Sequence, residues 1–440
     1  MDNQTSESLE KIRQLFENAP YPRIPLESSP KQNSALLYTH NIITAYYLRN
    51  QRVIETEGKV ILDAGCGTGY KSLILAEANP GAKIVGIDIS EKSIELAKER
   101  LHYHGFATAE FYCLPMEDLP TLEWEFDYIN NDEVLYVVPD PIVALRAMKS
   151  VLKPEGIIRT NYHSSRQRYP YFQIQEFFQK IGVMDTEPQH LAIEMVRETM
   201  RALNDQVFVK ETTWKPAFET DDQRVLMNCI IQGDRGYNIA EMFSALRNAD
   251  LDFISMVNWR QWELAELFKD LDNLPVFLAM SLSETSVEER LYLFELLHPI
   301  HRLLDLWCGH PNQAKTFVPV SEWTRTDWQG VQVHLHPQLR TANLREDLLA
   351  CITDLRTFEI SQHLLLAESA VTMDSSIAVC LLPLLEKPQP MMSLVERWKQ
   401  GRPVHPVTLE PTEEEEAFDI VKNLLTWLES LGYILLERQS

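Results

Sequence analysis

The stretch that decides the fold covers residues 60–88 and reads VILDAGCGTGYKSLILAEANPGAKIVGID. A hydrophobic run ends in Asp63, a glycine-rich turn and a helical stretch follow, and a second β-rich run ends in Asp88. The glycines of the turn are Gly65, Gly67 and Gly69. A strand, a glycine turn, a helix and a second strand with a terminal acid form a nucleotide-binding βαβ unit. The glycines let the backbone approach a ligand closely, and the acid can accept hydrogen bonds from both hydroxyls of a ribose.

Tyr70 narrows the choice of nucleotide. A dinucleotide fingerprint needs a third glycine at that position, and a P-loop needs Lys-Ser or Lys-Thr directly after its last glycine. The turn, with the acid Asp63 before it and Ile-Asp-Ile-Ser after it, instead resembles motif I of the class I S-adenosylmethionine-dependent methyltransferases. A plain tight turn in an α/β protein is the alternative.

The resemblance implies a cofactor, S-adenosylmethionine, and the residues that hold it. Asp63 would face the amino acid portion of the cofactor, Asp88 would hold the ribose hydroxyls, and Ile89 would pack on the adenine. The turn residues would lie under the methionine and ribose portions; they are Gly65, Cys66, Gly67 and Gly69.

The adenine contact departs from the family pattern. Similar methyltransferases begin the turn that ends in E-D-L-P with an acid, which binds the adenine amino group. This chain has Pro115 at that place, so we expect the contact to come from Glu117 or from Met116. Met116 as an ordinary core residue is the alternative.

Four residues that follow the fourth and fifth expected strands are candidates for the methyl-transfer site. They are Asn131, Asp132, Tyr162 and His163. The carboxyl ends of strands present residues to the ligand in a doubly wound sheet. Asn131 is also a candidate for the cofactor site. Asp132 could equally cap a helix, and His163 is either a general base or a structural histidine. The motif N-N-D-E at 130–133 is not the N-P-P-Y of methylases that act on exocyclic amines.

The alternation of strands and helices over residues 58–162 predicts an α/β fold with a doubly wound, Rossmann-like sheet. We expect residues 1–164 and about 236–262 to form the methyltransferase domain, and 165–235 to form a mostly helical insertion over the active site. In this interpretation, a helix over 239–247 and a strand over 251–257 close the sheet. Residues 263–314 are expected to be a helical connector.

Residues 315–440 are expected to form a C-terminal α+β domain that is winged-helix-like. Its last helix would begin at a capping box, Thr412-Glu413-Glu414-Glu415. A second, broader resemblance includes Pro20-Tyr21-Pro22 and this C-terminal region. It is to methyltransferases with a regulatory domain, some of which modify protein lysines. The chain also resembles bacterial, cyanobacterial-type proteins of unassigned substrate, with which it shares runs such as residues 256–262.

The composition excludes several classes of partner. The 440 residues carry 64 acidic and 41 basic side chains, a net charge of −23, which disfavours nucleic acid and anionic membranes. The six cysteines include no C-x-x-C, so neither a metal site nor a disulfide framework is indicated. No apolar run reaches the roughly 20 residues of a membrane span. We therefore expect a cytoplasmic protein.

Two hypotheses of different classes follow. The first is an enzyme that methylates a nitrogen or oxygen of a peptide, protein or mid-sized metabolite. The second is a catalytically silent cofactor-binding scaffold or sensor, which the absent acid at Pro115 permits. A homodimer is compatible with both. A nucleic-acid methyltransferase conflicts with the charge.

Overall fold

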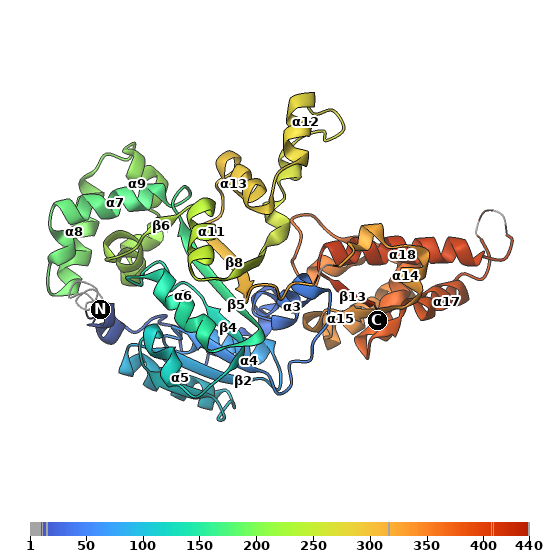
Figure 1. Cartoon of the computed structure of the whole chain (residues 1–440), viewed down its shortest axis with the longest axis horizontal. Helices are drawn as coiled ribbons and strands as arrows, with labels where there is room; N and C mark the ends of the chain where they lie inside the picture. Colours follow the sequence, from blue (N-terminus) through green and yellow to red (C-terminus); the bar gives the residue numbers. More distant parts are fainter. Residues whose placement is uncertain are drawn as a thin grey trace.

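The computed structural model describes residues 10, 12–14, 16–315, 317–405, 407 and 409–438. Its main sheet has eight strands in the order β3-β2-β1-β4-β5-β8-β7, with β6 paired to β5 (Figure 1). The strands are β1 Val60–Ala64, β2 Lys83–Asp88, β3 Glu110–Cys113, β4 Phe126–Asn131, β5 Leu152–Ser164, β6 Gly236–Tyr237, β7 Asp252–Met256 and β8 Leu303–Gly309. Strands β1 to β5 are parallel, which confirms the predicted Rossmann-like sheet.

Helices cover both faces of this sheet. They are α2 Ser34–Thr39, α3 Ile42–Asn50, α4 Tyr70–Ala78, α5 Glu91–Tyr103, α6 Pro141–Ser150 and α11 Ile239–Asn248. One apolar cluster joins β1 and β4 to α6 and α11, and another joins them to α3, α4 and α5. Apolar burial on both faces explains why the strands read as nearly continuous hydrophobic runs.

The strand order at one edge of the sheet differs from the sequence prediction. Strand β7 lies in the sheet as expected, but it is the edge strand and pairs only with β8. Strand β8 lies in the segment expected to be a helical connector, and it runs antiparallel to both β5 and β7. That segment also contains helices α12 Val276–Ser283 and α13 Val287–Leu297. The run Leu303–Gly309 is short and almost wholly apolar, so its periodicity does not distinguish a strand from a buried helix.

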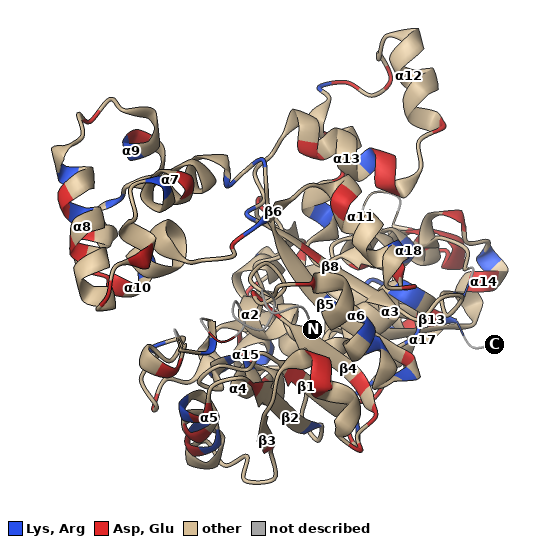
Figure 2. Cartoon of the chain, turned by 60° about the vertical axis from the view of Figure 1, so that its left-hand side comes forward, with Lys and Arg blue, Asp and Glu red and all other residues tan. Residues whose placement is uncertain are grey.

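The chain between β5 and β6 forms a helical lobe beside the sheet (Figure 2). Its helices are α7 Tyr169–Lys180, α8 Gln189–Ala202, α9 Phe208–Thr213 and α10 Asp222–Val225. The lobe has its own apolar core, which includes Phe178, Val196 and Leu226. Ala19, from the N-terminal segment, is buried in the same core.

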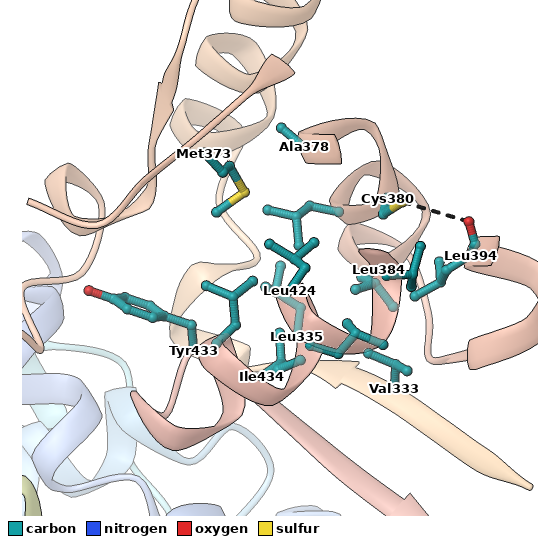
Figure 3. Close-up of a cluster of buried hydrophobic side chains, with 14 of the residues drawn as sticks. Val333, Leu335, Met373, Ala378, Cys380, Leu384, Leu394, Leu424, Tyr433 and Ile434 are labelled. Atoms are coloured by element: carbon teal, nitrogen blue, oxygen red, sulfur yellow. Dashed lines mark hydrogen bonds between the residues drawn. The ribbon is translucent and has the colours of Figure 1, made fainter. Parts of the chain in front are cut away.

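The C-terminal region contains a small antiparallel sheet in the order β12-β9-β13. Its strands are β9 Val331–Leu335, β12 Gln389–Pro390 and β13 Ile434–Arg438, and a separate pair is β10 Phe358–Glu359 with β11 Thr372–Met373. The helices are α14 Arg325–Gln329, α15 Ala342–Thr353, α16 Ser375–Ala378, α17 Met391–Gly401 and α18 Glu414–Ser430. Figure 3 shows side chains of β9, α18 and β13 meeting in one core, where the Cys380 thiol donates to the Leu394 carbonyl.

Two local expectations were wrong. The capping box predicted at Thr412 is not formed: its hydroxyl donates to the Arg402 carbonyl, and α18 begins after Glu413 without a side-chain cap. The aromatic-rich pattern over residues 36–52 predicts a single helix, but α2 and α3 are separated at His40 and Asn41. The Asn41 side chain caps α3.

The C-terminal region packs directly on α3. The buried ring of His336 lies 3.1 Å from the Thr44 hydroxyl through Nε2, and the Tyr47 hydroxyl accepts from the Leu436 amide at 3.1 Å. Tyr47 also donates to Glu429 at 2.7 Å.

Among the described residues, none of the helices has the length and apolar character needed to cross a bilayer.

Candidate active site

The glycine turn connects β1 to α4. The amides of Gly65 and Cys66 both donate to the Ile87 carbonyl, which ties the turn to the end of β2. Gly67 has a positive φ of 50°, and a Cβ there would lie 2.2 Å from the Tyr21 carbonyl oxygen. Only glycine therefore fits between the turn and the N-terminal segment.

Asp88 stands at the carboxyl end of β2 beside this turn. Its Oδ2 accepts from the Gly67 amide and its Oδ1 accepts from the Ser90 amide, both at 2.9 Å. Burial raises the pKa of Asp88, and these backbone donors work against that shift. The carboxylate is fixed in orientation, and each oxygen keeps a lone pair for a ligand hydroxyl.

A pocket opens in front of Asp88. Its wall is mostly apolar and includes five of the predicted cofactor residues, which are Gly65, Asp88, Ile89, Met116 and Glu117. Further lining residues that the sequence analysis did not single out are Ile12, Phe16, Leu114, Val134, Val137 and Val138. An apolar slot with one fixed carboxylate fits an adenosine, which presents a flat base and a diol. The residues present therefore fit S-adenosylmethionine.

The other predicted cofactor residues are not among the described residues that line this pocket. Asp63 is buried, with Oδ2 accepting from the Ser72 hydroxyl at 2.6 Å and Oδ1 accepting from Asn130 at 3.0 Å. Burial raises its pKa to about 6. Asn131 donates to the Ala64 carbonyl at 2.9 Å, so its side chain bridges β4 and β1. The Cys66 side chain and Gly69 pack against the protein interior.

The N-terminal segment lies across the glycine turn. The Thr68 amide donates to the Tyr21 carbonyl at 3.0 Å, and the Thr68 hydroxyl donates to the Pro22 carbonyl at 2.7 Å. Arg100 of α5 donates to the Ile24 and Thr68 carbonyls at 2.7 and 3.0 Å. These bonds hold the segment over the cofactor turn.

Asp132 belongs to a buried ion network. Its carboxylate pairs with Lys71, lies 3.7 Å from Arg159 and accepts from the Asn161 amide at 2.7 Å. Burial favours the protonated acid, but the charges of Arg159 and Lys71 hold the pKa of Asp132 well below its usual value. Arg159 also donates to Asp305 of β8 at 2.7 and 3.1 Å. The network joins β4, β5 and β8, so Asp132 positions these strands instead of capping a helix.

His163 makes a close pair with Asp234. Its Nδ1 lies 2.7 Å from Asp234 Oδ1, and since a carboxylate only accepts, Nδ1 carries the proton. Its Nε2 therefore holds the lone pair, which accepts from Arg302 Nη1 at 3.4 Å. Burial lowers the pKa of His163, and the hydrogen bond that Nδ1 donates to Asp234 partly opposes that shift. The imidazole is neutral at pH 7.

The surroundings of His163 fix its ring. Tyr136 stacks on the imidazole with a centroid distance of 3.6 Å and an interplanar angle of 19°. Asp234 is held in turn by Gln175 at 2.9 Å. Arg302 pairs with Glu133, whose φ of 62° is unusual for this residue type. The Glu133 amide donates to Asn161 Oδ1 at 2.8 Å, and such strain is common where a loop is shaped for a ligand.

Tyr162 lies apart from this group. Adjacent residues of a strand point to opposite faces, so Tyr162 faces away from His163 and is fully buried in the apolar core. Its ring packs on Tyr237 at 4.6 Å. We therefore leave Tyr162 out of the proposed site. The sequence analysis missed Asp234, Arg302 and Tyr136 as neighbours of His163, because no local pattern connects them.

Comparison with known proteins agrees with this arrangement. Residues 55–241 match a family model described as "Methyltransferase domain". The chain is 26% identical over 72% of its length to an uncharacterized protein of Synechococcus sp., of which it covers 74%. It is 39% identical over 24% of its length to the ubiquinone biosynthesis O-methyltransferase of Neisseria meningitidis serogroup C, and the match spans 44% of that enzyme.

A solved structure shares the fold over nearly the whole chain. PKMT2 from Rickettsia typhi in complex with AdoHcy superposes with a TM-score of 0.58 at 16% identity, over 96% of this chain and 78% of that one. The glycine turn, Asp88 and the pocket in front of them thus occur in a methyltransferase sheet. The chain contains a class I methyltransferase domain, and the protein is an S-adenosylmethionine-dependent methyltransferase.

Proposed function

We propose that the protein methylates an oxygen or nitrogen atom that loses a proton during transfer, with His163 as the general base. The observation that carries this proposal is the His163–Asp234 pair, which makes Nε2 the ring nitrogen that can accept a proton. The acceptor would replace Arg302 Nη1, which donates to Nε2 at 3.4 Å. A neutral imidazole that donates to a buried carboxylate is the arrangement used by general bases in acyl transfer.

The bound cofactor supplies an activated methyl group on a sulfonium. The residues of this chain would supply the remaining functions. Asp88 would hold the ribose hydroxyls, and the apolar residues Ile89 and Met116 would pack on the base. Asp63 would counter the charge of the amino acid portion. His163 would take the proton of the acceptor atom, and Asp234 would stabilise the resulting imidazolium.

The helical lobe supports an acceptor larger than a simple metabolite. Asp234 lies between this lobe and β6, so the candidate base joins the lobe to the sheet. The lobe presents large apolar side chains to solvent, including Phe177, Leu191 and Phe208. Exposed apolar side chains of this kind favour a peptide, a protein or a mid-sized metabolite as the acceptor.

The C-terminal sheet and its helices α15, α17 and α18 support a winged-helix-like assignment for this domain. The acids at the start of α18, which are Glu414, Glu415 and Glu416, argue against contact with nucleic acid. We propose that the domain serves protein contacts, including contact with a second copy of the chain.

Labelled S-adenosylmethionine and a cell extract test the acceptor proposal. We expect the wild-type protein to label a peptide, a protein or a mid-sized metabolite, and His163→Ala to reduce that labelling about a hundredfold while the cofactor still binds. His190→Ala is the matched control, because His190 is an exposed histidine of the lobe. Labelling of nucleic acid alone, or full labelling by His163→Ala, would contradict the proposal.

A further inference from the structure

The N-terminal helix forms one wall of the nucleoside pocket. Ile12 and Phe16 both line the pocket together with Asp88 and Met116. The two residues are four positions apart, so they share one face of a helix. Figure 1 shows this helix in dark blue, near the sheet and the helical lobe. The pocket is therefore built partly from a segment outside the matched methyltransferase domain.

Glu17 follows Phe16 on this helix and has an unsatisfied carboxylate. Its Oε2 is buried, and among the residues that the structure describes it has no hydrogen-bond partner. The negative charge of Glu17 helps to raise the pKa of Asp88 and of Cys113, so its carboxylate lies near both groups. Leaving a buried acceptor without a donor is costly, which points to a donor outside the described part of the chain.

The nucleoside is the donor that fits this position. Glu17 and Asp88 repel each other, and a neutral hydroxyl or amino group near them would satisfy an acceptor without adding negative charge. The turn after β3 includes Pro115, which has no side-chain acceptor. We propose that Glu17 accepts a hydrogen bond from a hydroxyl or amino group of the nucleoside portion of bound S-adenosylmethionine, so that the N-terminal helix completes the cofactor site.

The chain just after Glu17 is already anchored at the site. Ala19 is buried in the core of the helical lobe, and the Tyr21 carbonyl accepts from the Thr68 amide of the glycine turn. A side chain two residues before an anchored position can be placed reproducibly at the pocket. The helix and the bound nucleoside then stabilise each other, because each provides contacts that the other lacks.

Calorimetry with S-adenosylhomocysteine tests this proposal without any acceptor. We expect Glu17→Ala to weaken binding about tenfold, the scale of one hydrogen bond to a charged group. Asn18→Ala is the matched control, since Asn18 is exposed on the same helix, and its affinity should equal that of wild type. Circular dichroism checks that both variants fold. Unchanged affinity in Glu17→Ala would overturn the proposal.

Two analogues identify the donor. One replaces the adenine amino group by an oxo group, and the other lacks the ribose 3′-hydroxyl. The analogue that lacks the true donor should bind wild type more weakly than S-adenosylhomocysteine does. It should bind Glu17→Ala about as tightly as S-adenosylhomocysteine does, because the hydrogen bond is already absent. Equal additional losses in both proteins, for both analogues, would overturn a direct contact. Hydrogen exchange of residues 10–18 gives a second readout: S-adenosylhomocysteine should slow it in wild type, and no change would overturn the proposal.

Discussion

His163 and Asp234 are 71 residues apart in the sequence and 2.7 Å apart in the structure. The histidine ends β5, and the aspartate lies just before β6, after the whole helical lobe. Because Asp234 fixes the tautomer of the imidazole, the segment that follows the lobe determines which ring nitrogen carries the proton. A helical insertion that only covered the site would not hold a carboxylate against this ring.

The Asp234→Asn variant should lose most methyl transfer. The amide cannot stabilise an imidazolium and can present a donor to Nδ1, which favours the unproductive tautomer. We expect kcat/KM to fall at least a hundredfold, within the range of general-base effects, while cofactor affinity stays unchanged. The measurement is steady-state transfer of labelled methyl to the acceptor found in the extract.

Asp185→Asn is the matched control for this variant, because Asp185 is an exposed acid of the same lobe. Its kcat/KM should be that of wild type. A fall of less than threefold in Asp234→Asn would show that the pair is structural.

The pH profile should reflect the neutral imidazole. Burial lowers the pKa of His163 below 6.5, so the base is deprotonated throughout the neutral range. We expect kcat/KM to be level near pH 7 and to decline as the pH falls below about 6.5, since protonation removes the Nε2 lone pair. The hydrogen bond that His163 donates to Asp234 raises this pKa, so the acid limb of the residual Asp234→Asn activity should move to lower pH. A limb that moves to higher pH would contradict the assignment.

Gly67→Ala should disturb the N-terminal segment. The new Cβ would meet the Tyr21 carbonyl at 2.2 Å, so the segment must move off the glycine turn. Gly58→Ala is the control: Gly58 also has positive φ, but a Cβ there meets nothing within 4 Å. We expect both variants to lose about 1 kcal/mol of unfolding free energy from backbone strain. Gly67→Ala should lose a further 1–3 kcal/mol or so from overpacking.

Urea denaturation measures this difference, and calorimetry should show weaker cofactor binding for Gly67→Ala alone. Equal stability and equal affinity in the two variants would mean that the close approach of Tyr21 to the turn contributes neither to the free energy of unfolding nor to cofactor binding.

Arg159→Met should be strongly destabilising. It leaves the carboxylates of Asp132 and Asp305 buried without this cation, a change that typically costs about 3–5 kcal/mol. Arg345→Met is the contrast, since the pair of Arg345 with Glu386 is exposed and should be worth less than about 1 kcal/mol. Denaturant midpoints measure both. Similar losses would show that burial adds nothing to the Arg159 network.

The sequence predicted the parts of the fold that depend on local pattern. The glycine turn, strands β1 to β5 and the position of Asp88 all follow from spacing within about thirty residues. Five of the predicted cofactor residues line the pocket, because parallel strands and their following loops meet at one sheet edge.

The remaining features depend on contacts that no local pattern records. Strand β8 is a short apolar run, and only its pairing with β5 and β7 distinguishes it from a helix. Asp234 and Glu17 became candidates only when the tertiary structure placed them beside His163 and Asp88. Tyr162 was grouped with His163 because the two are adjacent in sequence, and strand alternation separates them.

The packing of the C-terminal region on α3 has a consequence for how this protein can be divided. Tyr38, from α2, is buried in the C-terminal core, and Trp259 packs against both that core and one face of the main sheet. The two regions thus share side chains, as parts of one cooperative unit do. A genetic fusion that exchanged residues 315–440 for another domain would expose Tyr38 and Tyr47 to water. The C-terminal region is therefore not an interchangeable module. An exchange of residues 315–440 between related proteins must also transfer the surface of α2 and α3 that these residues contact.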